Sequence, residues 1–220
     1  MFYCSDFYYI CAMKNVLHTL GNTPVTTAAI ALLYPKLSGS TQKVAALENA
    51  GDIIRLKRGL YVVNPEVSGK RISLGLVANH LYSPSYVSML SALRWYGLIP
   101  ERVAVVQSMT VKHSRSFSNS LGTFEYTLVK KNYFHIGLRH EEYDGSAFII
   151  ASPEKALCDL IANTSGINLR YYKEAQYYLE EDLRLDMDAF SRFDVSILKQ
   201  CAKTGKKANS IETIIKLLER

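Results

Sequence analysis

The chain has 220 residues, of which 48% are hydrophobic and 21% are charged, and its formal net charge at pH 7 is +6. This is an ordinary globular mixture that can build the core of one large or two small domains. No stretch approaches the roughly 20 consecutive apolar residues of a membrane-spanning helix. The composition therefore predicts a folded protein and excludes one embedded in a membrane by such a helix.

The cysteines contain no C-x-x-C pair and have no nearby histidine at zinc-ligand spacing. Scattered free thiols are typical of a reducing compartment. Residues 1–12 lack the leading positive charge and the clear cleavage site of a signal peptide. We therefore expect a cytoplasmic protein with no metal, no cofactor and no membrane contact. The four cysteines are Cys4, Cys11, Cys158 and Cys201.

Positive charge is unevenly distributed along the chain. Residues 1–80 carry eight Lys and Arg against four Asp and Glu, and residues 102–140 carry six against one. Residues 141–220 carry eleven against fourteen and are mildly acidic. Two basic regions indicate nucleic acid or another acidic partner.

The first elements expected in chain order are three helices. Residues 8–20 form the first of these, and Thr26-Thr27 opens a second over residues 28–33, which Tyr34-Pro35 ends because proline lacks the backbone N–H. Ser38-Gly39-Ser40 then supplies a turn and an N-cap. Residues 41–50 form the third helix, and Gly51 follows at the position of a C-terminal glycine.

A tight basic hairpin comes next. Ile53–Leu56 and Leu60–Val63 are β-rich runs joined by Lys57-Arg58-Gly59. Two short helices followed by such a hairpin indicate a winged helix-turn-helix. Two adjacent cations at the tip favour contact with a phosphate backbone, although a winged fold used only for protein contacts is an alternative.

The face of the third helix can be derived from its angular positions at about 100° per residue. Val44 and Leu47 mark the buried direction, and amides and alanines on the opposite side suit adenine edges and thymine methyl groups in the major groove. Glu48 is the one charge that does not suit this face. The outward residues are Thr41, Gln42, Ala45, Ala46 and Asn49. The predicted DNA contacts, including phosphate contacts, are Lys36, Ser40, Thr41, Gln42, Lys43, Asn49, Arg55, Lys57 and Arg58.

A loop-rich stretch at residues 64–69 predicts a boundary between a winged helix-turn-helix domain, 1–68, and a second domain, 69–220. The second domain is expected to be α+β, with a small, largely antiparallel sheet and a helical tail. Its expected elements are helices at 72–81 and 86–96, a strand at 103–111, a polar loop at 112–122, a strand at 124–129, a turn at 130–132, a turn at Asp144-Gly145 before the apolar run 147–151, a helix capped by Ser152-Pro153-Glu154, and about three helices over 171–220.

Three segments in this order resemble the AbiEi-type antitoxins of bacterial type IV toxin–antitoxin and abortive-infection systems. They are Ile-Ile-Arg-Leu-Lys-Arg-Gly-Leu-Tyr-Val-Val at 53–63, Ser85-Tyr86-Val87-Ser88 with Ala92-Leu93 and Tyr96-Gly97-Leu98-Ile99-Pro100, and Ala151-Ser152-Pro153-Glu154-Lys155-Ala156-Leu157 with Asp159-Leu160. The resemblance covers roughly residues 14–165, and the last fifty residues match only as a helical tail.

The resemblance implies a winged domain that represses its own operon at inverted repeats in double-stranded DNA. It also implies a second domain that counters a nucleotidyltransferase-like toxin without forming a stable complex with it. On this basis the central basic segment is the expected antitoxin patch, if its strand ends and loop converge on one surface. Its residues are Lys112, Arg115, Lys130, Lys131 and Arg139.

Catalytic alternatives are weaker. Asp186-Met187-Asp188 has the form of a metal-binding pair, but Gly145-Ser146 lies too far upstream for a nucleotidyltransferase, so helix-start acids are favoured. Thr204-Gly205-Lys206-Lys207 lacks the residues that complete a phosphate loop and is interpreted as a basic connection. Histidines and serines without partners at catalytic spacing complete the candidates, and they are His113, His135, His140, Ser83, Ser85 and Ser88.

The sequence thus favours a DNA-binding autorepressor and antitoxin without enzyme activity. One alternative is a nucleic-acid-processing enzyme that uses the winged domain for docking. The others are a plain transcriptional regulator without a toxin, and a protein-interaction module.

Overall fold

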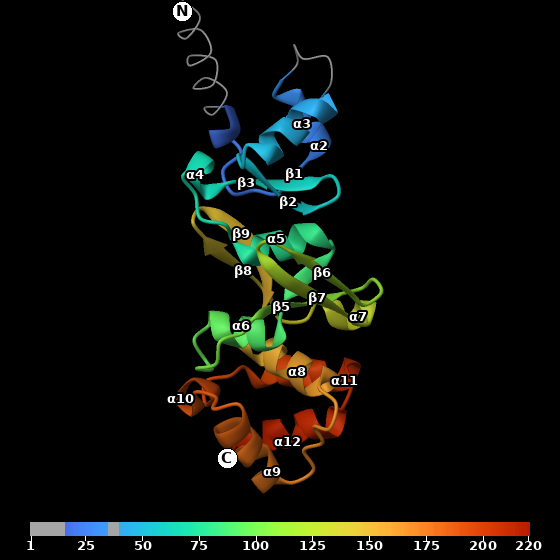
Figure 1. The fold of residues 1–220 in the computed structure, drawn as a ribbon. Helices are drawn as coiled ribbons and strands as arrows, with labels where there is room; N and C mark the ends of the chain where they lie inside the picture. Colours follow the sequence, from blue (N-terminus) through green and yellow to red (C-terminus); the bar gives the residue numbers. More distant parts are fainter. Residues whose placement is uncertain (1–15, 35–39) are drawn as a thin grey trace, which may run out of the picture.

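The computed structural model of the protein describes residues 16–34 and 40–220, which form a mixed α+β fold with a three-stranded and a six-stranded sheet (Figure 1). Of the predicted first helix, 8–20, residues 16–18 are helical and residues 19–20 belong to a turn, so the helix ends two residues earlier than predicted; residues 8–15 lie outside the described residues. No helix in the described ranges is long and apolar enough to cross a membrane.

The second and third predicted helices, 28–33 and 41–50, are both found to within one residue. The hydroxyl of Thr26 accepts a hydrogen bond from the amide of Ala29 at 3.2 Å and caps the helix Thr27–Leu32. Gly51 has a φ of 76°, the left-handed conformation that lets the chain leave the next helix and enter a strand. These elements are β1 (Val25–Thr26), α2 (Thr27–Leu32), α3 (Ser40–Asn49), β2 (Ile53–Lys57) and β3 (Leu60–Val63).

The β2–β3 hairpin contributes to two hydrophobic cores. Tyr61 and Val63 face a small cluster with residues of α2 and α3, whereas Leu60 and Val62 join the main core of the protein. Alternate residues of a strand point to opposite faces of its sheet, which is how one strand serves both cores. The N-terminal unit is therefore packed against the rest of the chain on an apolar face.

Polar contacts strengthen this junction. The Nδ2 of Asn119 donates to the carbonyl of Leu56 at 3.1 Å, and the Nδ2 of Asn22 donates to the carbonyl of Arg71 at 2.9 Å. The amide of Arg71 in turn donates to a carboxylate oxygen of Asp144 at 2.6 Å. The predicted boundary at 68/69 thus joins two units that share a packed and hydrogen-bonded interface.

The six-stranded sheet is larger than predicted and is mixed, with the strand order β6-β7-β5-β4-β9-β8. Three neighbouring pairs are antiparallel, whereas β4–β9 and β5–β7 are parallel. The α+β class is as predicted, and the sheet that was predicted to be small and largely antiparallel has six strands, with three antiparallel and two parallel pairs. The strands are β4 (Ser85–Val87), β5 (Val105–Thr110), β6 (Arg115–Asn119), β7 (Gly122–Leu128), β8 (Leu138–Tyr143) and β9 (Ser146–Ala151).

Two predictions in this region were wrong. The segment expected to be a helix over 86–96 begins as β4, because Tyr86 and Val87 are buried between β5 and β9, and the helix starts only at Met89. The segment expected to be a polar loop at 112–122 contains β6. Within β6 the one apolar residue is Phe117, so the alternation of apolar and polar residues is too weak to predict a strand. Pairing with β7 is what holds this segment as a strand.

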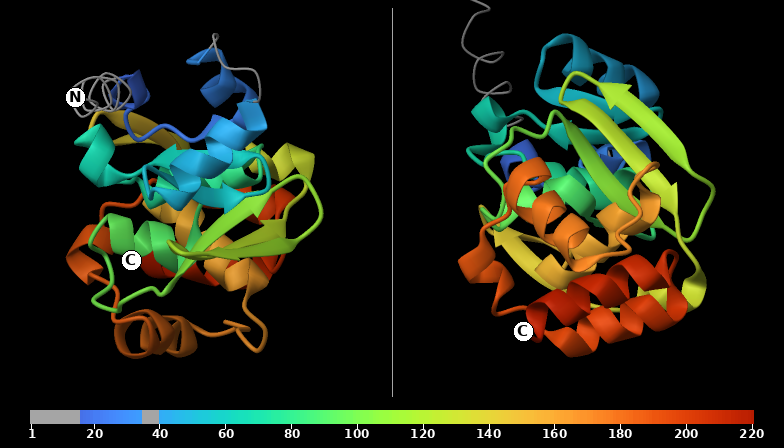
Figure 2. Two further views of the ribbon diagram at one scale, coloured as in Figure 1. Left: turned by 45° about the horizontal axis from the view of Figure 1, so that its top comes forward. Right: turned by 90° about the horizontal axis from the view of Figure 1, so that it is seen from below.

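Helices cover the sheet and extend the molecule beyond it. Helix α5 lies between the three-stranded sheet and the six-stranded one, and α9 to α12 form the end opposite α3 (Figure 1). Helices α11 and α12 lie side by side (Figure 2). The helices are α4 (Pro65–Ser68), α5 (Leu74–Leu81), α6 (Met89–Trp95), α7 (Lys131–Phe134), α8 (Pro153–Asn163), α9 (Tyr172–Tyr177), the π-helical turn Tyr178–Asp182, α10 (Met187–Phe190), α11 (Val195–Thr204) and α12 (Ala208–Leu218).

Candidate functional site

Helix α3 presents its polar side to solvent at the free end of the molecule (Figure 1). Val44 and Leu47 are 2% and 4% exposed, which confirms the predicted buried direction. Gln42 and Asn49 are exposed on the other side, with Ala45 and Ala46 between them. Lys36 and the side chains of Ser40 and Thr41 lie outside the described part of the structure.

Glu48, the charge that did not suit the exposed face of α3, has an ion-pair partner. A carboxylate oxygen of Glu48 lies 2.5 Å from Nη2 of Arg55 on the neighbouring strand β2. This hydrogen bond is the main reason why the pKa of Arg55 is raised above its ordinary value. The Arg55 guanidinium also lies 5.8 Å from the ring centre of Tyr61, and the Lys43 ammonium lies 5.1 Å from that of Tyr34. The face therefore carries amides and alanines with Glu48 neutralised.

The two cations at the hairpin tip have different environments. The Nζ of Lys57 donates to the carbonyl of Leu81, at the C-terminal end of α5, at 2.5 Å. Cations are favourable at helix C-termini, so this contact helps to hold the hairpin on α5. Arg58, in contrast, is exposed. Of the two residues predicted to contact phosphates at the tip, Arg58 is therefore open to solvent, whereas Lys57 is half-buried against the six-stranded sheet.

Lys57 belongs to a group of three cations that we call the basic cluster, with Lys112 and Arg115. Burial lowers the pKa of Lys57, and the charges of Arg115 and Lys112 lower it further. The Nζ of Lys112 donates to the carbonyl of Ser83 at 2.5 Å. No member of the basic cluster forms an ion pair with a carboxylate within the described ranges.

Aromatic rings form the floor beneath the basic cluster. The ammonium of Lys57 and the guanidinium of Arg115 lie 5.8 and 5.0 Å from the ring centre of Phe117, and the ammonium of Lys112 lies 5.3 Å from that of Tyr82. The two rings are 5.7 Å apart, centre to centre. The cluster thus joins the N-terminal hairpin to the edge strand β6 through cation–π contacts.

The predicted antitoxin patch does not converge completely. Lys112 and Arg115 lie near the end of β7, because the hydroxyl of Ser114 accepts from the amide of Leu128 at 3.0 Å. Lys130 lies between the end of β7 and the start of α7, Lys131 is the first residue of α7, and both are exposed. Arg139, however, is on β8, which is at the other edge of the sheet from β6, with Nη2 4.0 Å from a carboxylate oxygen of Glu154. Five strand spacings separate these edges by about 24 Å. The assumption of one shared surface is therefore wrong for Arg139.

A second cluster, which the sequence did not lead us to expect, is buried beneath the sheet. Lys155 and Asp159 of α8 are fully buried, with Nζ and Oδ1 3.3 Å apart. The other oxygen of Asp159 accepts from the hydroxyls of Tyr86 at 3.0 Å and Ser88 at 2.6 Å. The only sequence signal was an i,i+4 pair of opposite charges within the apolar helix 153–163.

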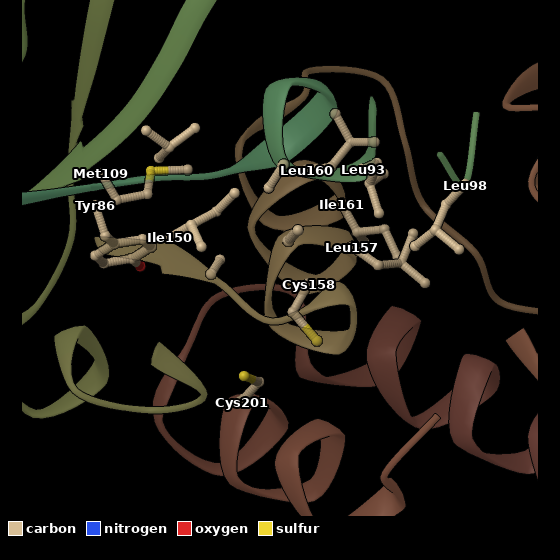
Figure 3. Packing of buried hydrophobic residues seen from close by; sticks show 14 of the residues in the cluster. Tyr86, Leu93, Leu98, Met109, Ile150, Leu157, Cys158, Leu160, Ile161 and Cys201 are labelled. Carbon is tan, nitrogen blue, oxygen red and sulfur yellow. The ribbon is translucent and has the colours of Figure 1, made fainter. Parts of the chain in front are cut away.

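Lys155 makes further contacts in this buried network. Its Nζ donates to the carbonyl of Tyr133 at 3.2 Å and lies 2.9 Å from the centre of that ring. Burial lowers the pKa of Lys155, and Asp159 opposes this shift. Cys158 of α8 and Cys201 of α11 lie close to each other nearby (Figure 3). Because the two charged side chains have no exposed surface, they can hold α8 in place but cannot meet a substrate in this structure.

The structure assigns local roles to several of the catalytic alternatives. Asp186 caps α10 by accepting from the amide of Ala189 at 3.0 Å, which confirms the interpretation as a helix-start acid. The hydroxyl of Ser146 donates to Asn22, and that of Thr204 donates to the carbonyl of Gln200. No group of three metal-ligating side chains is present in the part of the chain that the structure describes.

The sequence matches no model of a known protein family, and no curated protein matches it either.

Proposed function

We propose that the chain is a sequence-specific DNA-binding transcriptional regulator whose N-terminal unit is a winged helix-turn-helix. In this proposal α2 and α3 are the helix pair, α3 is the recognition helix, and the β2–β3 hairpin is the wing. The observation that carries the proposal is the exposed side of α3, where Gln42 and Asn49 flank two alanines at the free end of the molecule.

The chemistry of this side suits the major groove. An amide side chain can donate to and accept from an adenine edge, and alanines permit close approach and contact with a thymine methyl. Glu48 would repel phosphates, but its ion pair with Arg55 cancels that charge locally. Arg58 at the exposed wing tip supplies a cation for the backbone beside the groove.

The basic cluster adds a second cationic surface beside the tip of the wing. Its three cations have no carboxylate partner within the described ranges. A phosphate-rich partner would relieve the repulsion among them, because it supplies the missing negative charge. This favours a nucleic-acid partner over a partner of neutral surface.

Binding to the DNA directly upstream of the gene tests the proposal. Gln42→Ala should weaken binding to the operator by about 1 to 3 kcal/mol and have little effect on random DNA. Lys43→Ala is the matched control on the same helix and should weaken both equally, since a phosphate contact is blind to sequence. Arg58→Ala should weaken both and reduce the salt slope by about one unit.

Two results would contradict this assignment. Wild-type protein that binds upstream and random duplexes with equal affinity would not be a sequence-specific regulator. Equal losses on both duplexes for Gln42→Ala would show that α3 does not read bases.

The family resemblance extends the proposal to an antitoxin that opposes a nucleotidyltransferase-like toxin. Lys112, Arg115, Lys130 and Lys131 then remain as the patch, without Arg139. Changing these four residues to glutamate should abolish protection in a growth-rescue assay, because the change of eight charge units repels an acidic target. A promoter–reporter assay should show that operator repression is weakened but not lost, because Lys112 and Arg115 belong to the basic cluster whereas the side chains of α3 are unchanged. Full rescue by the folded quadruple variant would exclude the patch.

A further inference from the structure

A cavity of about 210 Å³ lies where the end of β7 meets the C-terminal ends of α8 and α11. Its walls are mainly apolar, with Val129 and Ala162 buried in them and Leu128 at 44% exposure. An apolar side chain as exposed as Leu128 next to a cavity offers surface that a ligand can cover. The lining residues are Leu128, Val129, Lys130, Tyr133, Ala162, Asn163, Thr204, Gly205 and Lys206.

The connection between α11 and α12 is fitted closely to this cavity. A Cβ atom added at Gly205 would lie 2.8 Å from Cε2 of Tyr133 and 2.7 Å from the carbonyl oxygen of Cys201. Only glycine allows this approach without displacing backbone. The segment Thr204-Gly205-Lys206-Lys207, which resembled part of a phosphate loop, therefore packs on an aromatic ring and places Lys206 in the cavity wall.

The charge around the cavity has one sign. Lys130 and Lys206 line it and are exposed, and no Asp or Glu is among the lining residues. Neither lysine forms an ion pair within the described ranges. Lys207, next along the chain, differs because its ammonium donates to the carbonyls of Thr164 and Ile167 at 2.6 and 2.9 Å.

Size and chemistry together define the class of ligand. An apolar cavity of about 150 Å³ is large enough for benzene. A somewhat larger cavity with an aromatic wall suits one ring or two fused rings, and two cations at its rim suit a single carboxylate. We propose that this cavity is a binding site for a small aromatic carboxylate. The site is remote from α3, and the proposal does not depend on DNA binding.

Titration calorimetry with 1-naphthoate tests the site on the full chain. The wild type should bind 1-naphthoate at one site, and 1-naphthalenemethanol, which has no charge, roughly tenfold more weakly. Lys130→Gln/Lys206→Gln should lose roughly tenfold in affinity for 1-naphthoate and keep its affinity for the alcohol. Lys203→Gln, an exposed lysine on α11 outside the cavity, is the matched control and should bind as the wild type does.

A second variant places a carboxylate at the rim without changing the core. Leu128→Glu should abolish measurable 1-naphthoate binding by repulsion, and circular dichroism should show an unchanged fold because the side chain is already 44% exposed. The proposal is overturned if the wild type shows no saturable binding. It is also overturned if acid and alcohol bind equally, or if Lys203→Gln weakens binding as much as the double variant does.

Discussion

Two of the places where lysine side chains lie against aromatic rings can be compared directly, and they differ in their counter-ions. Beneath the sheet, Lys155 has the ring and carbonyl of Tyr133 and also the carboxylate of Asp159. Beside the hairpin tip, Lys57 and Lys112 each have a ring and a carbonyl but no carboxylate within the described ranges. Two clusters of similar contacts therefore differ in their counter-ion.

The difference follows from solvent access. A charge with no exposed surface must be paired, because water cannot stabilise it. The basic cluster is close to solvent, so the fold tolerates like charges there at a modest cost. The chain has 20 acidic residues, and none forms an ion pair with this cluster within the described ranges. A complete buried pair indicates a structural role, whereas an incomplete surface cluster leaves room for an external anion.

Removing the buried counter-ion should have the largest effect. Asp159→Ala leaves the ammonium of Lys155 buried and unpaired, and it removes the acceptor of the hydroxyls of Tyr86 and Ser88. We expect the free energy of unfolding to fall by about 3 to 5 kcal/mol, measured by urea denaturation.

The matched control removes both charges. Lys155→Met/Asp159→Leu should be clearly less destabilising than Asp159→Ala, because no buried charge is left without a partner. If the single and double variants lose equal stability, the loss is due to packing and the ion pair does not explain the role of this cluster.

Local signals predicted the N-terminal unit better than the sheet. The cap at Thr26, the glycine at 51 and the spacing of Val44 and Leu47 are encoded within one or two helical turns, and each is found where expected. Strand β6 depends on pairing with β7, which no local pattern shows.

The candidate sites also divide into those that local sequence predicts and those that depend on contacts between distant segments. The exposed side of α3 could be derived from helical periodicity alone. The basic cluster could not, because it joins Lys57 to Arg115 across a junction between the hairpin and a strand that the sequence did not predict. Arg139 seemed close to the other basic residues in the chain, but the strand order places it at the opposite edge.

Neutralising part of the basic cluster should have a smaller effect than removing the buried counter-ion, and the effect should be on the affinity for nucleic acid. Lys112→Gln/Arg115→Gln should weaken binding to any duplex and reduce the salt slope by up to about two units, since each phosphate contact releases roughly one counter-ion. Fluorescence anisotropy with a random duplex over a range of NaCl concentrations measures this slope.

A control variant loses two positive charges at the other end of the molecule. Lys199→Gln/Lys203→Gln on α11 should leave the slope unchanged, because α11 lies far from the hairpin (Figure 1). An unchanged slope for Lys112→Gln/Arg115→Gln would show that the basic cluster does not touch the duplex.

The smallest effect concerns repulsion within the basic cluster. The folded-state pKa of Lys57 is below its ordinary value of 10.5, so the unfolded chain binds this proton more readily in the window between the two values. Stability from this group should therefore rise as pH rises through that window. Replacing Arg115 with glutamine removes one cause of the lowered pKa and should make the rise smaller, as followed by urea denaturation across alkaline pH.

Salt separates this repulsion from the contact of Arg115 with Phe117, because ions screen charges but have little effect on the stacked ring. At neutral pH, raising NaCl should stabilise Arg115→Gln less than the wild type, by a few tenths of a kcal/mol. Arg184→Gln makes the same change in net charge but removes an ion pair with Glu101, so it should be stabilised by salt more than the wild type is. If Arg115→Gln behaves like Arg184→Gln, Arg115 has an attractive partner, and the basic cluster is not the incomplete counterpart of the buried pair.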